Sequence, residues 1–488
     1  MKRVHYISLF TAFLLVFSAC SEDKMDEINK NVNNPTDVGA NLILPDVLAS
    51  TAFSVVGSDL AFYASVYVEH NVGIYGQLYN AEIRTSEPTS ATTYNNSWNT
   101  IYRNLRNLRT IINKCSEGGD EEGNVHLLAM AQILTAYNLA ILTDLMGDVP
   151  WSEALQPGVI FTPKLDAQQS IYKYVFDLLD EAIANLDTDR DPSFAVLGSK
   201  DLLYGSLTGY DDDYFKWWTE FAYGLKARYT LRLAHKTPDY ESVIEFANNS
   251  FKDAGTEAKF RFNNESAKSP FYAFYTDRNY FGASTSLHDK LVERNDPRDT
   301  IFFVPAKDKT DIEFAPNGKP NQVQDYYGIS GITNAKAPIY LLSYHEIEFL
   351  KAEAYVRLNQ LPEAKEALKN AVIAAMGKSN IAIDEEDAEE YFDDVVANKF
   401  DTDPLKEVMV QKYIAFFEEE AVEAYNDIRR LKAMGDNVIE LSHPMPDRFP
   451  LRFTYGSSDV TTNVLIRDAY GDGSYVYTQN VWWAGGTR

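Results

Sequence analysis

Apolar residues recur every three or four positions through several long stretches of the chain, and this spacing constrains the fold more than any other feature. One stretch runs from Trp98 to Ile112, a second from Ala129 to Ala140, and a third from Ile171 to Leu186. The spacing places the apolar side chains along one stripe of an amphipathic helix, which is stable only when it packs against a neighbour. The sequence therefore predicts an all-α body.

The longest apolar stripe lies near the end of the chain, between Val410 and Leu431. Asp403 occupies a suitable N-cap position, Pro404 suits the first helical turn, and Gly435 follows the last apolar residue. These are the start and stop signals of a helix. We therefore predict one uninterrupted helix between Pro404 and Gly435.

Residues 344–376 have the spacing of a tetratricopeptide helix pair. Ala352 and Tyr355 are followed by Ala364, Leu368 and Ala371. The small alanines let two helices approach closely, and the larger side chains fill the gap between pairs. Other helical hairpins of similar length support a scaffold built from such pairs.

The remaining stretches are rich in Gly, Pro, Asn, Asp and Tyr and lack a helical period. This composition is typical of loops and short strands. We expect a single body over residues 39–488, with helical repeats at about 40–240 and 340–435 and an irregular subdomain at about 241–339 and 436–488.

The first twenty residues have the features of a lipoprotein signal peptide. A basic start precedes an apolar stretch from Ile7 to Phe17, which is too short to span a membrane. Two small residues then precede Cys20, as in a lipobox, although Phe17 stands where Leu is usual. We predict a signal peptide at 1–19, a lipidated Cys20, and a tether that completes residues 20–38. The alternative is an ordinary signal peptide that contains a cysteine.

Charge and cysteine content limit the partners and cofactors. The formal net charge of −26 repels nucleic acids and anionic lipids, so we exclude nucleic-acid binding and expect membrane attachment through the lipid alone. Cys20 and Cys115 cannot form a disulfide framework or a cysteine-based metal site. The run Asp211–Asp213 lacks the pattern of an EF-hand loop. We predict a solvated loop there and no cofactor, with structural calcium as the alternative.

Two groups of charged residues call for a structural or a functional interpretation. Asp144 and Asp148 stand where a predicted helix ends, and we expect them to hold turn amides, with a metal site as the alternative. Asp427 is followed by Arg429 and Arg430. We expect an ion pair that fixes this helix against the irregular subdomain, with a ligand clamp as the alternative.

Two segments combine aromatic rings with amides and charges, as a carbohydrate site does. In the first, from Val72 to Tyr94, the candidate ligand residues are Tyr75, Gln77, Tyr79, Asn80, Arg84 and Tyr94. In the second, from Ser269 to Phe281, they are Phe271, Tyr272, Tyr275, Asp277, Arg278, Asn279 and Tyr280. We interpret both segments as loops, in which exposed rings indicate a ligand. The alternative is that the rings form a small core beneath the loops.

The order of several motifs resembles the SusD/RagB family of outer-membrane nutrient-binding lipoproteins, and within it the SusD-like group. The matching segments are Trp98–Tyr102, Leu142–Trp151, Pro163–Asp166, Asp201–Tyr204, Trp217–Leu233, Glu346–Tyr355, Gln411–Tyr413, Glu423–Arg430 and Val481–Trp483. The acidic residues after Cys20 are also similar to the signal that sends Bacteroidota lipoproteins to the cell exterior.

The resemblance implies a fold of four tetratricopeptide-like units that carry a less regular subdomain. It implies a SusC-like TonB-dependent transporter as partner, and binding of glycan, or in some members peptide, without catalysis. We therefore expect a surface-exposed, lipid-anchored outer-membrane protein that delivers a nutrient oligomer to its transporter. A tetratricopeptide-type adhesin and a helical glycosidase are the alternatives. The chain has no nucleophile elbow, His-Glu metal motif or phosphate-binding loop, so we expect no enzymatic activity.

Overall fold

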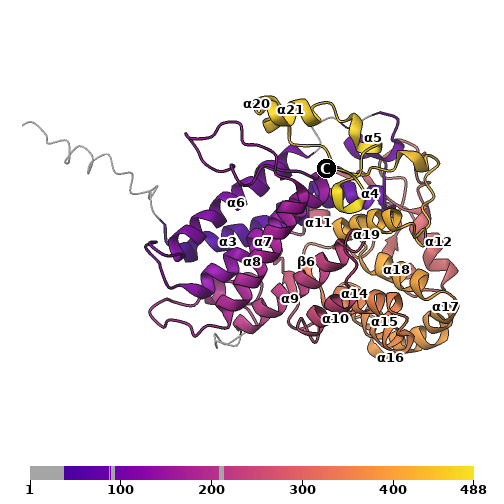
Figure 1. The fold of residues 1–488 in the computed structure, drawn as a ribbon. Coiled ribbons are helices and arrows are strands. Elements are labelled where there is room, and N and C mark those ends of the chain that lie inside the picture. The colour runs from indigo at the N-terminus through magenta and orange to yellow at the C-terminus, as the bar shows by residue number, and fades with distance from the viewer. Residues whose placement is uncertain (1–37, 87, 89–93, 208–213) are drawn as a thin grey trace, which may run out of the picture.

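The computed structural model describes residues 38–86, 88, 94–207 and 214–488. The predicted signal peptide, Cys20, the tether up to residue 37 and the run Asp211–Asp213 lie outside the described residues. The described chain is mainly helical (Figure 1), which confirms the predicted fold class.

A first group of helices comes from the N-terminal half of the chain. Its members are α3 (Ala40–Ser50), the π-helical turn η1 (Thr51–Val56), α4 (Asp59–Tyr67), α6 (Asn95–Cys115), α7 (Val125–Met146), α8 (Gln168–Leu186), α9 (Tyr214–Arg232) and α10 (Tyr240–Asn248). The helix α7 packs against both α6 and α8, and α9 packs against α8. The predicted stripes face these contacts, since Trp98 and Leu105 of α6 and Val175 of α8 are fully buried.

Two described stretches, Ala40–Tyr67 and α7, are long and apolar enough to cross a membrane. In α7, 89% of the apolar window is buried inside the protein, and in Ala40–Tyr67 the share is 56%. A helix enclosed on all sides by its own chain is apolar all round because it is core. The composition of α7 is therefore explained by its place at the centre of the first helical group.

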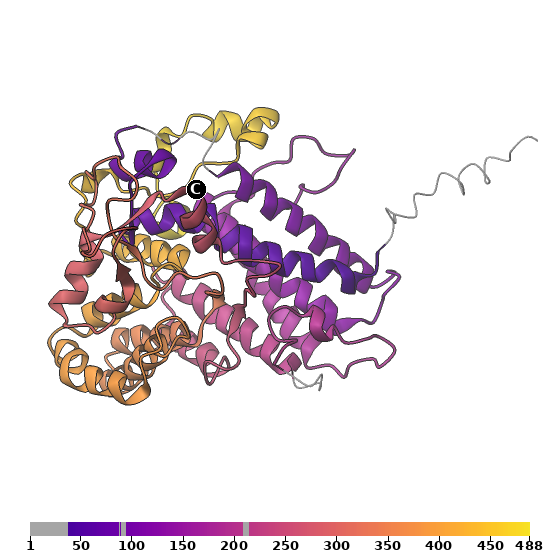
Figure 2. The same cartoon turned by 180° about the vertical axis from the view of Figure 1, so that it is seen from behind.

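A second group of helices follows later in the chain and lies across the molecule from α6, α7 and α8, as the view from behind also shows (Figure 2). Its members are α14 (Tyr344–Arg357), α15 (Leu361–Met376), α16 (Glu385–Tyr391), η3 (Phe392–Val396), α17 (Ala397–Thr402), α18 (Pro404–Ala415) and α19 (Ala421–Met434). The predicted tetratricopeptide pair is α14 and α15, which pack together. Ala352, Ala364 and Leu368 are fully buried between them and their neighbours.

The prediction of one helix between Pro404 and Gly435 is wrong, because α18 ends at Ala415 and α19 begins at Ala421. Both outer signals are correct: the Asp403 carboxylate accepts a hydrogen bond from the Lys406 amide at 3.1 Å, and Gly435 ends α19 with φ 84°. The interruption centres on Glu418, which has φ 62°. A helix cannot continue through that left-handed backbone.

Hydrogen bonds to three consecutive buried glutamates stabilise this interruption. Glu418 lies 3.2 Å from the Tyr275 hydroxyl, Glu419 accepts from Lys378 Nζ at 2.8 Å, and Glu420 accepts from Ser343 Oγ at 2.7 Å. The three partners come from separate parts of the chain, and buried carboxyl groups require such partners. Tertiary contacts therefore outweigh the helical preference of the local sequence.

The irregular part of the chain contains short helices and paired strands. The helices are α11 (Pro270–Arg278), α12 (Thr285–Glu293), α13 (Asp299–Phe302), α20 (Ser457–Thr462) and α21 (Val464–Tyr470), and α5 (Gly76–Ile83) lies near the last two (Figure 1). Three antiparallel pairs are formed by β1 (Asn71–Gly73) with β3 (Phe281–Ala283), β2 (Ala258–Phe260) with β6 (Ile339–Leu342), and β4 (Phe303–Val304) with β5 (Ile329–Ser330). In the first pair Val72 lies opposite Gly282. Strand pairing thus joins segments that are far apart in sequence.

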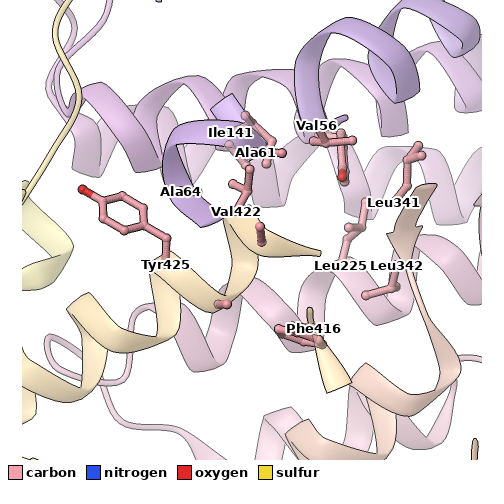
Figure 3. Packing of buried hydrophobic residues seen from close by; sticks show 14 of the residues in the cluster. Val56, Ala61, Ala64, Ile141, Leu225, Leu341, Leu342, Phe416, Val422 and Tyr425 are labelled. Atoms are coloured by element: carbon pink, nitrogen blue, oxygen red, sulfur yellow. The ribbon is translucent and has the colours of Figure 1, made fainter. Parts of the chain in front are cut away.

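One hydrophobic core joins the two helical groups (Figure 3). Ala61 of α4 and Ile141 of α7 lie near Val422 of α19, and Leu225 of α9 lies near Leu342 of β6. All five side chains are buried. The core therefore fixes α4, and the segments that follow it, against the second helical group.

Charged residues of α19 form ion pairs that stabilise its packing within this core. Asp427 pairs with Lys412 Nζ at 2.7 Å and Arg430 at 2.9 Å, and Arg430 also pairs with Glu353 at 2.6 Å. These ion pairs fix α19 against α18 and α14, not against the irregular subdomain. Arg429 contacts the later irregular stretch through a hydrogen bond to the carbonyl of Leu451 at 3.1 Å, which is not the predicted ion pair.

The two acids at the end of α7 have different roles. Asp148 accepts a hydrogen bond from the Gln168 amide at 2.9 Å, as predicted for an acid that holds a turn. Asp144 accepts from the Tyr172 hydroxyl and lies 3.5 Å from Arg232 Nε, so it holds side chains rather than amides. Burial raises the pKa of Asp144 to about 6.

Candidate functional site

Two cavities open along different faces of the helix α11. The first cavity has a volume of about 450 Å³ and contacts Pro270, Ala273, Phe274 and Asp277. The second has a volume of about 600 Å³ and contacts Tyr272, Tyr275, Thr276 and Asn279. Each set has the i, i+3, i+4, i+7 spacing of one helical face. Asp277 and Arg278, in the last turn, border both cavities.

The first cavity lies where α11 meets the N-terminal helices. The lining residues that come from outside α11 are Phe53, Ser54, Ser58, Asp59, Phe62, Tyr63, Gln77, Asn96, Ser97 and Thr100. They supply rings, hydroxyl groups, two amides and one carboxylate. Burial raises the pKa of Asp59. This mixture suits a ligand that presents both apolar faces and hydroxyl groups.

The first predicted ligand segment is not a single loop, because it contains β1 and α5. Gln77 is exposed and lines the first cavity. Tyr75 is 38% exposed, and its ring centroid lies 5.4 Å from that of Tyr280. Tyr79 and Asn80 lie on α5 outside the lining of both cavities.

Two residues of this segment belong to the core, which removes them from the candidate set. Arg84 is 1% exposed and donates to the Tyr67 carbonyl at 3.2 Å. Tyr94 is also 1% exposed, its hydroxyl bonds to that of Tyr67 at 2.9 Å, and its ring stacks on Phe453 with centroids 4.2 Å apart. For these two side chains, the small-core alternative is correct.

The second predicted segment is the helix α11 rather than a loop. Pro270 occupies its first turn, and Asn279 ends it in a left-handed conformation with φ 48°. Phe271 is buried, with its ring centroid 4.9 Å from that of Phe62, so it is core and not a ligand residue. Tyr280 follows the helix and packs on Tyr75.

The second cavity lies between α11 and the β4–β5 pair. Its lining outside α11 and Asn279 consists of Val304, Ala306, Lys307, Gln324, Asp325, Ile329, Ser330, Gly331 and Thr333. Tyr275 is buried, and its hydroxyl donates to Asn71 Oδ1 at 3.0 Å and lies 3.2 Å from Glu418. Burial raises the pKa of Glu418 to about 8.

The sequence of residues 63–455 matches the model of a family described as starch-binding and associating with the outer membrane. The chain belongs to the SusD-like family. The family match confirms the resemblance that the motifs predicted. No curated protein matches this SusD-like chain.

Solved structures agree with the family assignment. A SusD/RagB family protein from Bacteroides thetaiotaomicron is 43% identical, with a TM-score of 0.85 over 93% of this chain and 100% of that one. A SusD homolog from Bacteroides fragilis is 19% identical, with a TM-score of 0.69 over 92% and 100%. A chitin-binding SusD homolog from Flavobacterium johnsoniae is 18% identical, with a TM-score of 0.73 over 91% and 98%. The last two share the fold.

Several cavity residues of this SusD-like protein were not predicted from its sequence. Phe53 and Asp59 lie on apolar helices, Asn96 opens α6, and Lys307 and Gln324 lie in irregular segments. None stands in a motif with chemical meaning of its own. Only the fold brings them to α11. No group of three or more His, Cys, Asp or Glu side chains suited to a metal ion occurs among the described residues.

Proposed function

We propose that this SusD-like protein binds an oligosaccharide in the first cavity and delivers it, unmodified, to a SusC-like TonB-dependent transporter. One observation carries the proposal: Gln77 and the Asp277–Arg278 pair, about two hundred positions apart in sequence, border one cavity lined by rings and hydroxyl groups. These were the segments in which the sequence predicted ligand residues. The family description and the chitin-binding neighbour support a glycan as ligand.

The lining explains how a sugar would be held. The exposed ring of Phe53 and the half-buried ring of Phe274 offer faces for apolar C–H groups. Gln77 and Asn96 offer amides for hydroxyl groups. Hydrogen bonds to a solvated ligand contribute only about 0.5–1.5 kcal/mol each. We therefore expect dissociation constants in the micromolar to millimolar range, which correspond to binding free energies of roughly −8 to −4 kcal/mol.

The proposed location is the exterior face of the outer membrane, with the lipid on Cys20 as anchor. Anionic lipid headgroups repel a chain with a net charge of −26, so they do not hold it at the membrane. Two or three acyl chains are therefore required for durable attachment. Co-purification of a TonB-dependent barrel from detergent-solubilised membranes tests the proposed partner, and purification of the protein alone under conditions that preserve such barrels contradicts it.

Calorimetric titration of the purified protein with malto-oligosaccharides, chito-oligosaccharides and peptides tests the binding site. Gln77→Ala is expected to weaken binding of the best ligand by roughly fivefold, which corresponds to about 1 kcal/mol. Asn80→Ala is the matched control, because Asn80 is an exposed amide on the same helix outside both cavities. Equal affinities for the Gln77 and Asn80 variants contradict the site.

The same panel separates the proposed function from its alternatives. A response to peptides alone indicates a peptide-uptake protein. Appearance of shorter products after incubation with any glycan indicates a glycosidase. If no ligand of the panel binds and no barrel co-purifies, the result favours an adhesin and contradicts the uptake function.

A further inference from the structure

We infer that the second cavity is a further subsite for the same ligand. The protein then holds an extended, uncharged oligosaccharide across the C-terminal end of α11, whereas a disaccharide occupies the first cavity alone. This inference rests on the proposed function. Its first support is the helix itself, which turns one face to each cavity and ends where the two cavities meet.

The two side chains that border both cavities are accessible to a ligand. Asp277 and Arg278 are exposed and line both cavities. Within the described part of the chain, neither side chain has a hydrogen-bond or ion-pair partner. Most charged groups near the core of this protein are paired, as Arg430 is with Glu353. A carboxylate and a guanidinium side by side can accept from and donate to successive hydroxyl groups of one ligand.

Hydrogen bonds fix the wall of the second cavity against α11. Asn279 Nδ2 donates to Asp325 Oδ1 at 2.5 Å, and Gln324 Nε2 donates to the Arg278 carbonyl at 2.6 Å. Asn279 and Asp325 both adopt left-handed backbones, with φ 48° and 55°. A wall that is fixed before the ligand arrives loses less entropy on binding.

The size of the two cavities indicates more than one sugar ring. A cavity that encloses a drug-sized ligand has a volume of roughly 300–1,000 Å³. Each of these cavities, at about 450 and 600 Å³, falls within that range by itself. A ligand that fills both has to be extended, and a polymer fragment is the natural form.

Charge balance indicates that the ligand is uncharged. The second cavity contains two acids, Asp277 and Asp325, and two cations, Arg278 and Lys307. The first adds only the carboxylate of Asp59. Neither cavity concentrates positive charge, which a polyanionic glycan would require. The half-buried ring of Tyr272 and the hydroxyl of Thr276 suit a neutral sugar instead.

A substitution that fills only the second cavity tests the inference. Thr276 is exposed, lines that cavity alone, and bonds through its hydroxyl to its own helix. Thr276→Trp is expected to weaken maltoheptaose or chitohexaose binding about tenfold and to leave maltose or chitobiose binding unchanged. Gln77→Ala is expected to weaken short and long ligands alike. Thr300→Trp is the matched control, since Thr300 is an exposed threonine that bonds to its own backbone outside both cavities.

Each outcome has one meaning. No loss for the long ligands, or an equal loss for short and long ones, overturns the second subsite and leaves the proposed function intact. Failure of every glycan to bind the unaltered protein overturns both. If Thr276→Trp does not fold, as judged by circular dichroism, Lys307→Ala replaces it, because Lys307 is exposed and lines only the second cavity. The same selective loss for long ligands is then expected.

Discussion

At the scale of single residues, burial separates side chains that look equivalent in the sequence. Arg84 and Arg278 are both cations in segments that combine rings with amides. Arg84 is enclosed, and its guanidinium lies 5.7 Å from the ring centroid of Phe449. Arg278 is exposed between the two cavities. The first therefore serves the fold and the second is available to a ligand.

This difference predicts opposite effects of one substitution at two positions. Arg84→Met is expected to lower the free energy of unfolding by about 1–3 kcal/mol, because the Tyr67 carbonyl loses its buried donor. Arg278→Met is expected to change it by less than about 0.5 kcal/mol and to weaken glycan binding. Urea unfolding and calorimetric titration of both variants measure the two effects. A destabilised Arg278 variant with unchanged affinity would contradict the assignment.

At the scale of elements, the sequence predicted the helices whose partners are also regular helices. The predictions of the apolar stripes on α6 and α8 and of the α14–α15 pair are correct, because apolar residues follow the 3.6-residue period in each helix. The helix α11 was missed because rings occupy several of its faces, two of which border cavities. Its signals, Pro270 and Asn279, were present in the sequence.

The break between α18 and α19 could not be predicted, because the apolar stripe continues through it. What ends the helix is a set of partners that lie elsewhere in the chain, such as Tyr275, Lys378 and Ser343. Those contacts cannot be inferred from the residues near the break. The same reason explains why Asp59 and Lys307 were absent from the predicted site.

The break also predicts how stability depends on pH. Burial raises the pKa of Glu418 from 4.5 to about 8. A raised carboxyl pKa contributes stability that is fully present below pH 4.5 and is lost as the pH rises to about 8. Glu418→Gln keeps the shape and cannot ionise, so its advantage in stability over the unaltered protein should grow over this window.

Urea unfolding at pH 5 and pH 8 measures that advantage. We expect it to increase by at most about 1.4 kcal/mol per pH unit. Glu366→Gln is the control, because Glu366 is an exposed glutamate on α15. A constant difference between the Glu418 variant and the unaltered protein at both pH values would show that Glu418 does not titrate in this range.

At the scale of the whole molecule, one core joins the two helical groups and fixes the segments that form the cavities. The family and the helical scaffold were predictable, because they depend on periodicity and on the order of motifs along most of the chain. The shape of the site was not, since it depends on where α11 lies against α4, α6 and β5. The proposed lipid anchor belongs to this scale as well.

Cys20→Ser tests the anchor in cells. Without the thiol no diacylglycerol can be attached, so we expect the variant to be lost from the outer-membrane fraction and from the protease-accessible cell surface. Fractionation with immunoblotting, and mass spectrometry of the mature protein, measure these outcomes. Membrane retention of the variant equal to that of the unaltered protein would show that another feature provides attachment.

The most direct measurement is a crystal structure of the protein with maltoheptaose or chitohexaose, whichever binds in the titration. We expect sugar density beside Gln77 and Asn96 that passes Arg278 and reaches Lys307. Density seated away from α11, for example against α20 and α21, would contradict the site on which the proposed function depends.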